Sequence, residues 1–207
     1  MTGMNLNLVL AVVAAYLIGS LSFAVITSRL MGLADPRTYG SGNPGATNVL
    51  RSGSKAAAIV TLVFDALKGY LPVLAVYLWG QPLGLGVDAA VAVGLAAFLG
   101  HLWPVFFKFQ GGKGVATAAG VLFALNPLLG VATLASFALI VAFSRFVSLA
   151  SMVAAAFAPF YQALIWGLGP IVWGTAAMGA LLVWRHRANI ERLLAGTESK
   201  LGAKKNG

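Results

Sequence analysis

The chain has 207 residues, of which 59% are hydrophobic and 9% are charged, and its mean hydropathy is +0.88. A soluble domain carries about 25% charged residues, so this composition excludes a soluble globular protein and predicts an all-α integral membrane protein. The lack of cysteine excludes disulfide and thiolate chemistry. The net charge of +9 is interpreted as a membrane-orientation signal rather than a nucleic-acid-binding surface.

The apolar segments predict seven transmembrane helices in a single domain over residues 1–207, because each crossing needs about 20 apolar residues. The first segment is interpreted as a retained span, since no clear small-residue cleavage site follows it. Asn126-Pro127 divides the long run 115–143, because proline disfavours helix in the residue before it. The predicted spans are 5–28, 56–79, 84–102, 115–126, 127–143, 149–166 and 170–184.

Basic residues predict the orientation of these spans. With seven crossings, every Lys and Arg except Lys68 falls in the loops and tail of one side. Basic loops stay cytoplasmic, so the N-terminus is expected outside and the C-terminus in the cytoplasm. Tryptophans are typical of membrane interfaces, and all five fall near predicted span ends: Trp79, Trp103, Trp166, Trp173 and Trp184.

Lys68 lies inside the second predicted span, with Asp65 one turn earlier. Residues three apart face each other on a helix, and charges at that depth usually point into the protein. A structural ion pair is the favoured interpretation, with a functional role as the alternative.

The loop between the first two predicted spans is dense in small and polar residues and reads Gly-Ser-Gly-Asn-Pro-Gly-Ala-Thr-Asn-Val-Leu-Arg over 40–51. It contains G-x-G-x-x-G, but a transmembrane helix precedes it, so the dinucleotide-binding interpretation fails. Backbone amides of such a loop can surround a phosphate while Arg51 binds it bidentately. The alternative is a solvated loop between helices.

A second loop runs from Gly100-His101 to Gly111-Gly112-Lys113-Gly114 and ends at Thr117. It is not a Walker A motif, because Gly114 stands where Ser or Thr should follow the lysine. The glycines open a predicted helix, whose amides and dipole favour an anion beside Lys113. The alternative is a flexible loop with one snorkelling lysine.

Two further polar segments lie near the last two spans. Ser148-Leu149-Ala150-Ser151 opens the sixth span, where the serines either cap the helix or contact a ligand. His186 and Asn189 are three residues apart and share a helical face, with Glu198 beyond them. By itself such a cluster usually marks a basic juxtamembrane end. The spacing of the two histidines and few carboxylates gives no metal site.

Together these segments resemble, in order from about residue 15 to 198, the bacterial acyl-phosphate:glycerol-3-phosphate acyltransferases, the PlsY family. Ala150 departs from the glycine that the family often has. His101 also lacks the carboxylate of His-x4-Asp acyltransferases, because Phe106 stands there. The resemblance implies a seven-helix enzyme of the bacterial inner membrane with a cytoplasmic active site. It implies transfer of an acyl group from acyl phosphate to the 1-position of glycerol 3-phosphate, releasing phosphate and lysophosphatidic acid.

The resemblance implies no cofactor or metal, and the expected partners are acyl phosphate, glycerol 3-phosphate and membrane lipid, without nucleic acid and as a monomer. The base is either His186 or the donor's phosphate, and a covalent acyl-Ser41 is ranked lowest. Catalytic roles are predicted for Ser41, Arg51, Lys113, His186 and Asn189. Substrate-binding roles are predicted for Gly42, Asn43, Thr47, Asn48, His101, Gly111, Gly112, Gly114, Thr117, Ser148, Ser151 and Glu198, with Ser148 and Ser151 as alternatives.

Two other classes of protein remain as rivals. A transporter of a phosphorylated metabolite would also use broken helices and glycine-rich loops. It should place polar groups at mid-bilayer in repeated halves, however, and the sequence has no internal repeat. A structural membrane subunit would not need three polar loops on one face.

Overall fold

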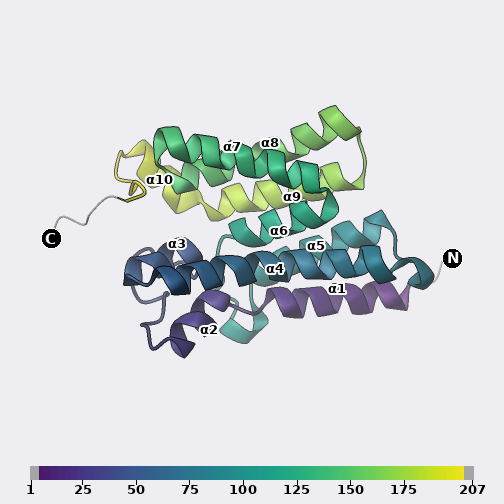
Figure 1. Ribbon diagram of the computed structural model, residues 1–207, viewed down its shortest axis with the longest axis horizontal. Helices are drawn as coiled ribbons and strands as arrows, with labels where there is room; N and C mark the ends of the chain where they lie inside the picture. Colours follow the sequence, from purple (N-terminus) through teal and green to yellow (C-terminus); the bar gives the residue numbers. More distant parts are fainter. Residues whose placement is uncertain (1–4, 203–207) are drawn as a thin grey trace. The chain divides into compact units, whose positions relative to one another are not determined.

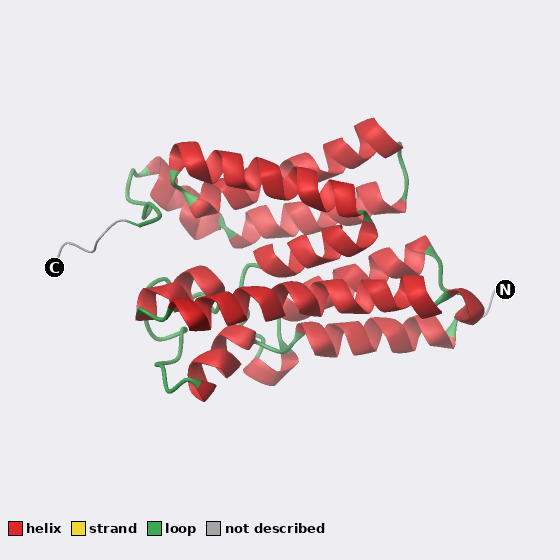
Figure 2. Cartoon of the chain, in the orientation of Figure 1, coloured by secondary structure: helices red, strands yellow, loops and turns green. Residues whose placement is uncertain are grey.

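The computed structural model describes residues 5–202, which form helices joined by loops, without a strand in that range (Figure 2). The N-terminal residues 1–4 and the tail lysines Lys204 and Lys205, used above for orientation, lie outside the described residues. The chain divides into two compact units, Met1–Asn126 and Pro127–Gly207. The boundary falls at the Asn126-Pro127 break that the sequence predicts.

Unit 1 contains six α-helices (Figure 1). They are α1 (Leu6–Gly19), α2 (Phe23–Leu30), α3 (Ala46–Val49), α4 (Lys55–Trp79), α5 (Val87–Leu102) and α6 (Val115–Leu125), with 3-10 turns at Leu50–Ser52, Gln81–Leu83 and Val105–Phe107. Helix α4 packs against α5 and α6, and α1 packs along α5. The short helices α2 and α3 rest on α4.

Glycines let these helices approach closely. A β-carbon on Gly120 of α6 would overlap the carbonyl of Ala66 in α4, and one on Gly100 of α5 would overlap the carbonyl of Tyr16 in α1. Small residues at crossings are the usual device of membrane helix packing, since lipid offers no hydrophobic gain between helices.

Unit 2 contains α7 (Pro127–Ser144), α8 (Val147–Trp166), α9 (Pro170–Arg185) and α10 (Arg187–Leu194) (Figure 1). Helix α8 packs against both α7 and α9. The helices predicted at 127–143, 149–166 and 170–184 are confirmed to within two residues. The helices predicted in unit 1 at 56–79 and 115–126 are confirmed as closely, and that at 84–102 begins three residues later.

The helix predicted over 5–28 is broken. It ends at Gly19 and resumes at Phe23, with a bend of 44° between α1 and α2. Ser20 explains part of the break, because its hydroxyl bonds back to the carbonyl of Tyr16 at 2.8 Å. Such back-bonding competes with the helical backbone and bends helices.

Four helical segments are long and apolar enough to cross a membrane, and the bent pair α1–α2 makes a fifth if it counts as one span. The four are α4, α5 with its following turn, α7 and α8. Helix α6 has 11 residues and spans only roughly 16 Å at 1.5 Å per residue. The five tryptophans lie at or near helix ends, as predicted.

Candidate functional site

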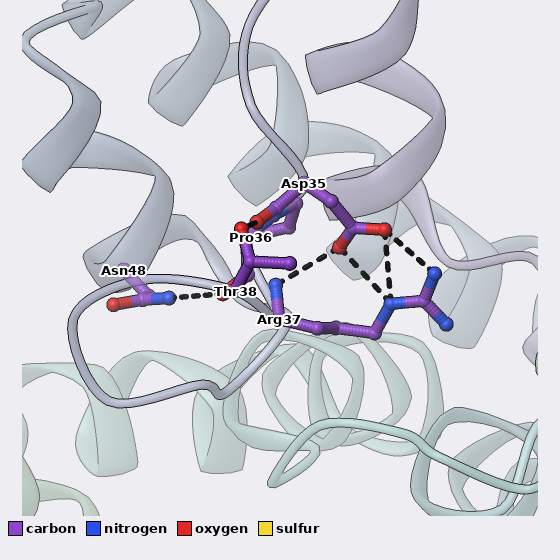
Figure 3. Close-up of polar contacts among 5 residues, drawn as sticks. All are labelled: Asp35, Pro36, Arg37, Thr38 and Asn48. Carbon is purple, nitrogen blue, oxygen red and sulfur yellow. Dashed lines mark hydrogen bonds and ion pairs between the residues drawn. The ribbon is translucent and has the colours of Figure 1, made fainter.

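Loop 35–51 joins α2 to α4 and is shaped by a single buried amide (Figure 3). Asn48 of α3 is 2% exposed. Its Nδ2 donates to the carbonyls of Pro36 at 2.6 Å and Tyr39 at 3.2 Å, and its Oδ1 accepts from the amide of Ser41 at 3.0 Å. Asn48, predicted to bind substrate, therefore holds three points of the loop backbone with its side chain.

An ion pair closes the start of the same loop (Figure 3). The Arg37 guanidinium donates to both oxygens of Asp35, the shortest bond being 2.6 Å, and the Arg37 amide donates to Asp35 Oδ1 at 2.9 Å. Hydrogen bonding from Arg37 is the main reason that the pKa of Asp35 lies below its usual range. Sequence reasoning did not select this pair, although Asp-Pro is a turn signal.

The reactive groups of loop 35–51 lie at its surface. Ser41, Thr47 and Arg51 are exposed, and Asn43 is half-buried. A β-carbon on Gly40, whose φ is +61°, would lie 3.2 Å from Nη1 of Arg51. The guanidinium therefore lies against Gly40 beside Ser41, and a side chain at position 40 would push it away. Arginine in such a position can bind a phosphate bidentately.

The glycine loop, Gly111–Gly114, precedes α6 and contacts loop 35–51. A β-carbon on Gly112 would lie 2.9 Å from the carbonyl oxygen of Pro44 and would overlap Nε2 of His101. Gly114 has a φ of +81° and packs on the Phe98 ring, which leaves no room for a side chain. The first two predicted motifs are thus in contact within unit 1, with half-buried Lys113 between these two glycines.

His101 and Thr117, both predicted to bind substrate, are buried at the ends of α5 and α6. Thr117 Oγ1 lies 3.1 Å from His101 Nδ1 and donates to the Asp65 carbonyl at 2.9 Å. The predicted ion pair of Asp65 with Lys68 is confirmed, at 2.8 Å between Oδ1 and Nζ.

In unit 2, the carboxylate of Glu198 gathers three donors. Ser148 Oγ, Asn189 Nδ2 and Arg192 Nε approach its oxygens at 2.6, 2.7 and 2.7 Å. These four residues are called the Glu198 cluster. Burial favours the neutral acid, but the three donors outweigh it, and the pKa of Glu198 is lowered. Arg192 belongs to the tail motif but was assigned no role of its own from sequence, because its spacing to Glu198 crosses the end of α10.

Neither candidate serine caps α8, which corrects one of the two interpretations of that segment. The N-cap residue is Phe146, without a side-chain cap bond. Ser148 joins the Glu198 cluster, and Ser151 donates to the Val147 carbonyl one turn back at 2.8 Å.

His186 is buried between α9 and α10, and its Nδ1 lies 2.8 Å from the carbonyl of Leu182. A carbonyl accepts only, so Nδ1 carries a proton. The backbone amide of Asn189 donates to the carbonyl of His186 at 2.7 Å, which places Asn189 one turn after His186. Within residues 5–202, no three His, Cys, Asp or Glu side chains are grouped as metal ligands.

The chain is similar in sequence to proteins of a known family. Residues 9–196 match the model of the glycerol-3-phosphate acyltransferase family. Proteins named glycerol-3-phosphate acyltransferase are similar in sequence. That of Burkholderia pseudomallei strain 1710b is 58% identical over 203 residues, covering 97% of this chain and 98% of the relative. That of Ralstonia nicotianae is 61% identical over 193 residues, covering 93% of each chain.

Two solved structures are also similar. Both are of PlsY, described as an integral membrane glycerol 3-phosphate acyltransferase. The glycerol 3-phosphate form has a TM-score of 0.87 and 40% identity, covering 95% of this chain and 96% of that one. The lysophosphatidic acid form has a TM-score of 0.85 and 39% identity, with the same coverage.

Proposed function

The chain belongs to the glycerol-3-phosphate acyltransferase family and is a multi-pass membrane acyltransferase, and we propose that it acylates the 1-position hydroxyl of glycerol 3-phosphate from acyl phosphate. The hydroxyl oxygen bonds to the acyl carbonyl carbon, and the bond from that carbon to the phosphate oxygen breaks. The products are lysophosphatidic acid and inorganic phosphate. The observation that carries the proposal is the contact at Gly112 between a loop bearing exposed Arg51 and a loop bearing Lys113.

Loop 35–51 and the glycine loop each carry groups suited to binding one phosphate. Lys113 and the amides of the glycine loop would hold the phosphate of the donor, close to the start of α6. Arg51 would bind glycerol 3-phosphate, together with the exposed or half-buried polar groups of Ser41, Asn43 and Thr47. Asn48 would act indirectly, by holding the backbone of loop 35–51 in place. An acyl phosphate is already activated, so positioning and charge stabilisation supply most of the catalysis.

The proton of the glycerol hydroxyl passes, in this proposal, to the phosphate of the donor. His186 is the alternative base, but it is 3% exposed and its Nδ1 faces the Leu182 carbonyl. His186→Ala and Asn189→Ala should then lower the rate with parallel pH profiles between pH 6 and 8. A selective loss in His186→Ala over that range would make histidine the base.

Direct transfer also predicts no covalent intermediate. Among the contacts described for Ser41, the hydroxyl accepts from the backbone amide of Asn43, at 3.4 Å, and no basic side chain is among its partners. Incubation with radiolabelled acyl phosphate alone should leave the protein unlabelled. A labelled serine in the digested protein would replace direct transfer with a two-step reaction.

The remaining part of the proposal concerns the membrane. We propose seven crossings with the N-terminus outside, so that both cationic loops face the cytoplasm of the bacterial inner membrane, and a monomer as the working unit. The orientation follows from the basic residues, and the bent pair α1–α2 would form one of the crossings. Labelling of single introduced cysteines at positions 82 and 108 from outside intact cells tests it. Position 82 should react, and position 108 should not.

The decisive experiment compares donors in a purified, detergent-solubilised protein. Acyl phosphate should support acylation of glycerol 3-phosphate with one phosphate released per product, whereas acyl-CoA should not. Lys113→Ala should reduce the rate by about 100-fold, whereas Lys55→Ala, an exposed lysine at the start of α4, should stay near wild type. Equal use of acyl-CoA, or an active Lys113→Ala, would contradict the proposal.

A further inference from the structure

Asp65 and Lys68 occupy the middle of α4 with 2% and 3% exposure, and the proposed reaction gives them no role. An ion pair inside a membrane protein is expensive to bury, and apolar residues of similar volume are often as stable. Two charged residues that contact neither solvent nor the exposed loops therefore need another explanation. The groups that Asp65 and Lys68 contact provide that explanation.

Lys68 reaches the break between α1 and α2. Its Nζ donates to the carbonyl of Leu21 at 2.7 Å, between the end of α1 at Gly19 and the start of α2 at Phe23. A backbone carbonyl at a helix break within a membrane needs a donor, because lipid offers none. Lys68 supplies that donor and so fixes the bend to α4.

Asp65 reaches in the other direction, toward α5 and α6. Its Oδ1 lies 2.8 Å from Lys68 Nζ and 3.7 Å from His101 Nδ1. Thr117 uses its one hydroxyl proton on the Asp65 carbonyl, so in its 3.1 Å contact with His101 the imidazole Nδ1 must be the donor. The hydrogen bond to the Thr117 hydroxyl orients the ring, and the carboxylate of Asp65 lies near the same nitrogen.

The Nε2 edge of the His101 ring contacts the glycine loop. A β-carbon on Gly112 would overlap His101 Nε2, and the Gly112 amide donates to the carbonyl of His101 at 3.1 Å. His101 therefore contacts the residue before Lys113 through both its ring and its backbone. A continuous series of contacts runs from the α1–α2 break through α4 and α5 to the glycine loop.

We infer that Asp65, Lys68 and His101 position the glycine loop, so that His101 acts on the donor phosphate through Gly112 and Lys113 rather than by touching substrate. The inference rests on the proposed function, in which this loop binds the acyl phosphate. In this inference, the buried charges of Asp65 and Lys68 contribute to the affinity for acyl phosphate.

The first test compares two substitutions at His101. His101→Leu removes the ring nitrogens and should raise KM for acyl phosphate about tenfold, with a smaller change in KM for glycerol 3-phosphate. His101→Asn keeps an amide donor near the place of Nδ1 and should recover most of the donor affinity. A purely structural role would instead lower the yield of folded enzyme and the apparent kcat while leaving both KM values unchanged.

The second test removes the charges as a pair, because one buried charge left alone can prevent folding. The double variant Asp65→Leu with Lys68→Met should raise KM for acyl phosphate as His101→Leu does. Asp88→Asn, an exposed carboxylate in the first turn of α5, is the matched control and should behave as wild type. If the double variant does not accumulate in membranes, the two His101 variants decide.

The outcomes distinguish a failure of the proposed function from a failure of the positioning role. A wild-type protein without acyl phosphate-dependent transfer would overturn the proposed function. An active wild type whose His101→Leu variant keeps its KM for acyl phosphate would overturn the positioning role alone. Equal rises in both KM values in His101→Leu, without recovery in His101→Asn, would also overturn it, because the effect would not be specific to the glycine loop.

Discussion

Loop 35–51 of unit 1 and the Glu198 cluster of unit 2 use their polar groups in opposite ways. In the loop, buried Asn48 binds the backbone and leaves Ser41 and Arg51 exposed. In the cluster, the donors of Asn189 and Arg192 bond to a carboxylate of the same chain. A polar group that is already satisfied within the protein contributes to stability, and one presented to solvent on a fixed backbone is available to a ligand. On the proposed function, we infer that the first region binds substrate and that the second stabilises the fold.

Removing the exposed guanidinium of Arg51 should have the largest effect on activity. Arg51→Ala should reduce acyl transfer by at least about 100-fold, because a bidentate phosphate contact is lost, while the thermal midpoint stays near wild type. Arg51→Lys should keep a minority of the activity, since a lysine cannot bind bidentately. Steady-state transfer and thermal unfolding of the purified proteins measure both.

Arg29→Ala provides the matched control for Arg51, because Arg29 is also exposed and lies at the end of α2. It should change transfer little. If both arginine variants lost activity equally, the effect would reflect the net charge of this face rather than a site at Arg51.

Asn48 tests whether the hydrogen bonds that hold loop 35–51 also matter for binding. Asn48→Ala removes three hydrogen bonds of loop 35–51 and should lower kcat/KM about tenfold through misplacement of the loop. Asn7→Ala, which removes an exposed amide bond to Leu83, should leave kinetics unchanged. Kinetics of Asn48→Ala equal to those of Asn7→Ala would show that the loop needs no such support.

Glu198 should affect stability more than chemistry. Glu198→Gln weakens charge-assisted bonds from three donors and should cost about 2 kcal/mol, which is a fall in Tm of about 4–8 °C for a chain of this size. Glu191→Gln, an exposed glutamate of α10, should not move the Tm. A full loss of turnover without a fall in Tm would place Glu198 in the chemistry instead.

The contribution of Glu198 should depend on pH in a definite direction. The pKa of Glu198 is lowered in the folded protein, so its stabilisation is complete above the ordinary glutamate value of 4.5 and is lost as pH falls through the folded pKa. The Tm difference between wild type and Glu198→Gln should therefore be constant near neutrality and shrink in acid. A difference that grows in acid would contradict the assignment.

Asp35 should give the smallest effect. Its ion pair with Arg37 is about one-third exposed, and surface pairs contribute about 0–1 kcal/mol. Asp35→Asn should change Tm and kcat/KM by amounts close to the experimental scatter, with Asp88→Asn as its control. A large kinetic loss would show that the Asp35–Arg37 bonds, like those of Asn48, hold the binding loop.

Much of the fold could be read from the sequence, because a membrane helix must satisfy its own backbone and the apolar runs are therefore long and bounded. The positions of α4, α7, α8 and α9 were predicted on that basis and are present. The helix boundary at Asn126-Pro127 was predicted from the proline and the Asp65–Lys68 pair from its i,i+3 spacing, and both are present. The break at Ser20–Ser22 was not predicted, because its cause includes a tertiary partner, the Lys68 ammonium on the Leu21 carbonyl.

Composition and motif order were sufficient to predict the class of protein, its family and the two cationic loops, because that information is local in the chain. The folded arrangement was needed to show which polar side chains are exposed and which are bonded within the protein. Asn48, Ser148 and His101 are predicted from sequence to bind substrate, and the structure adds that each is buried and contacts polar groups of the same unit. The physical reason is that a hydrogen-bond donor has the same identity in either role, and its partners come from distant parts of the chain.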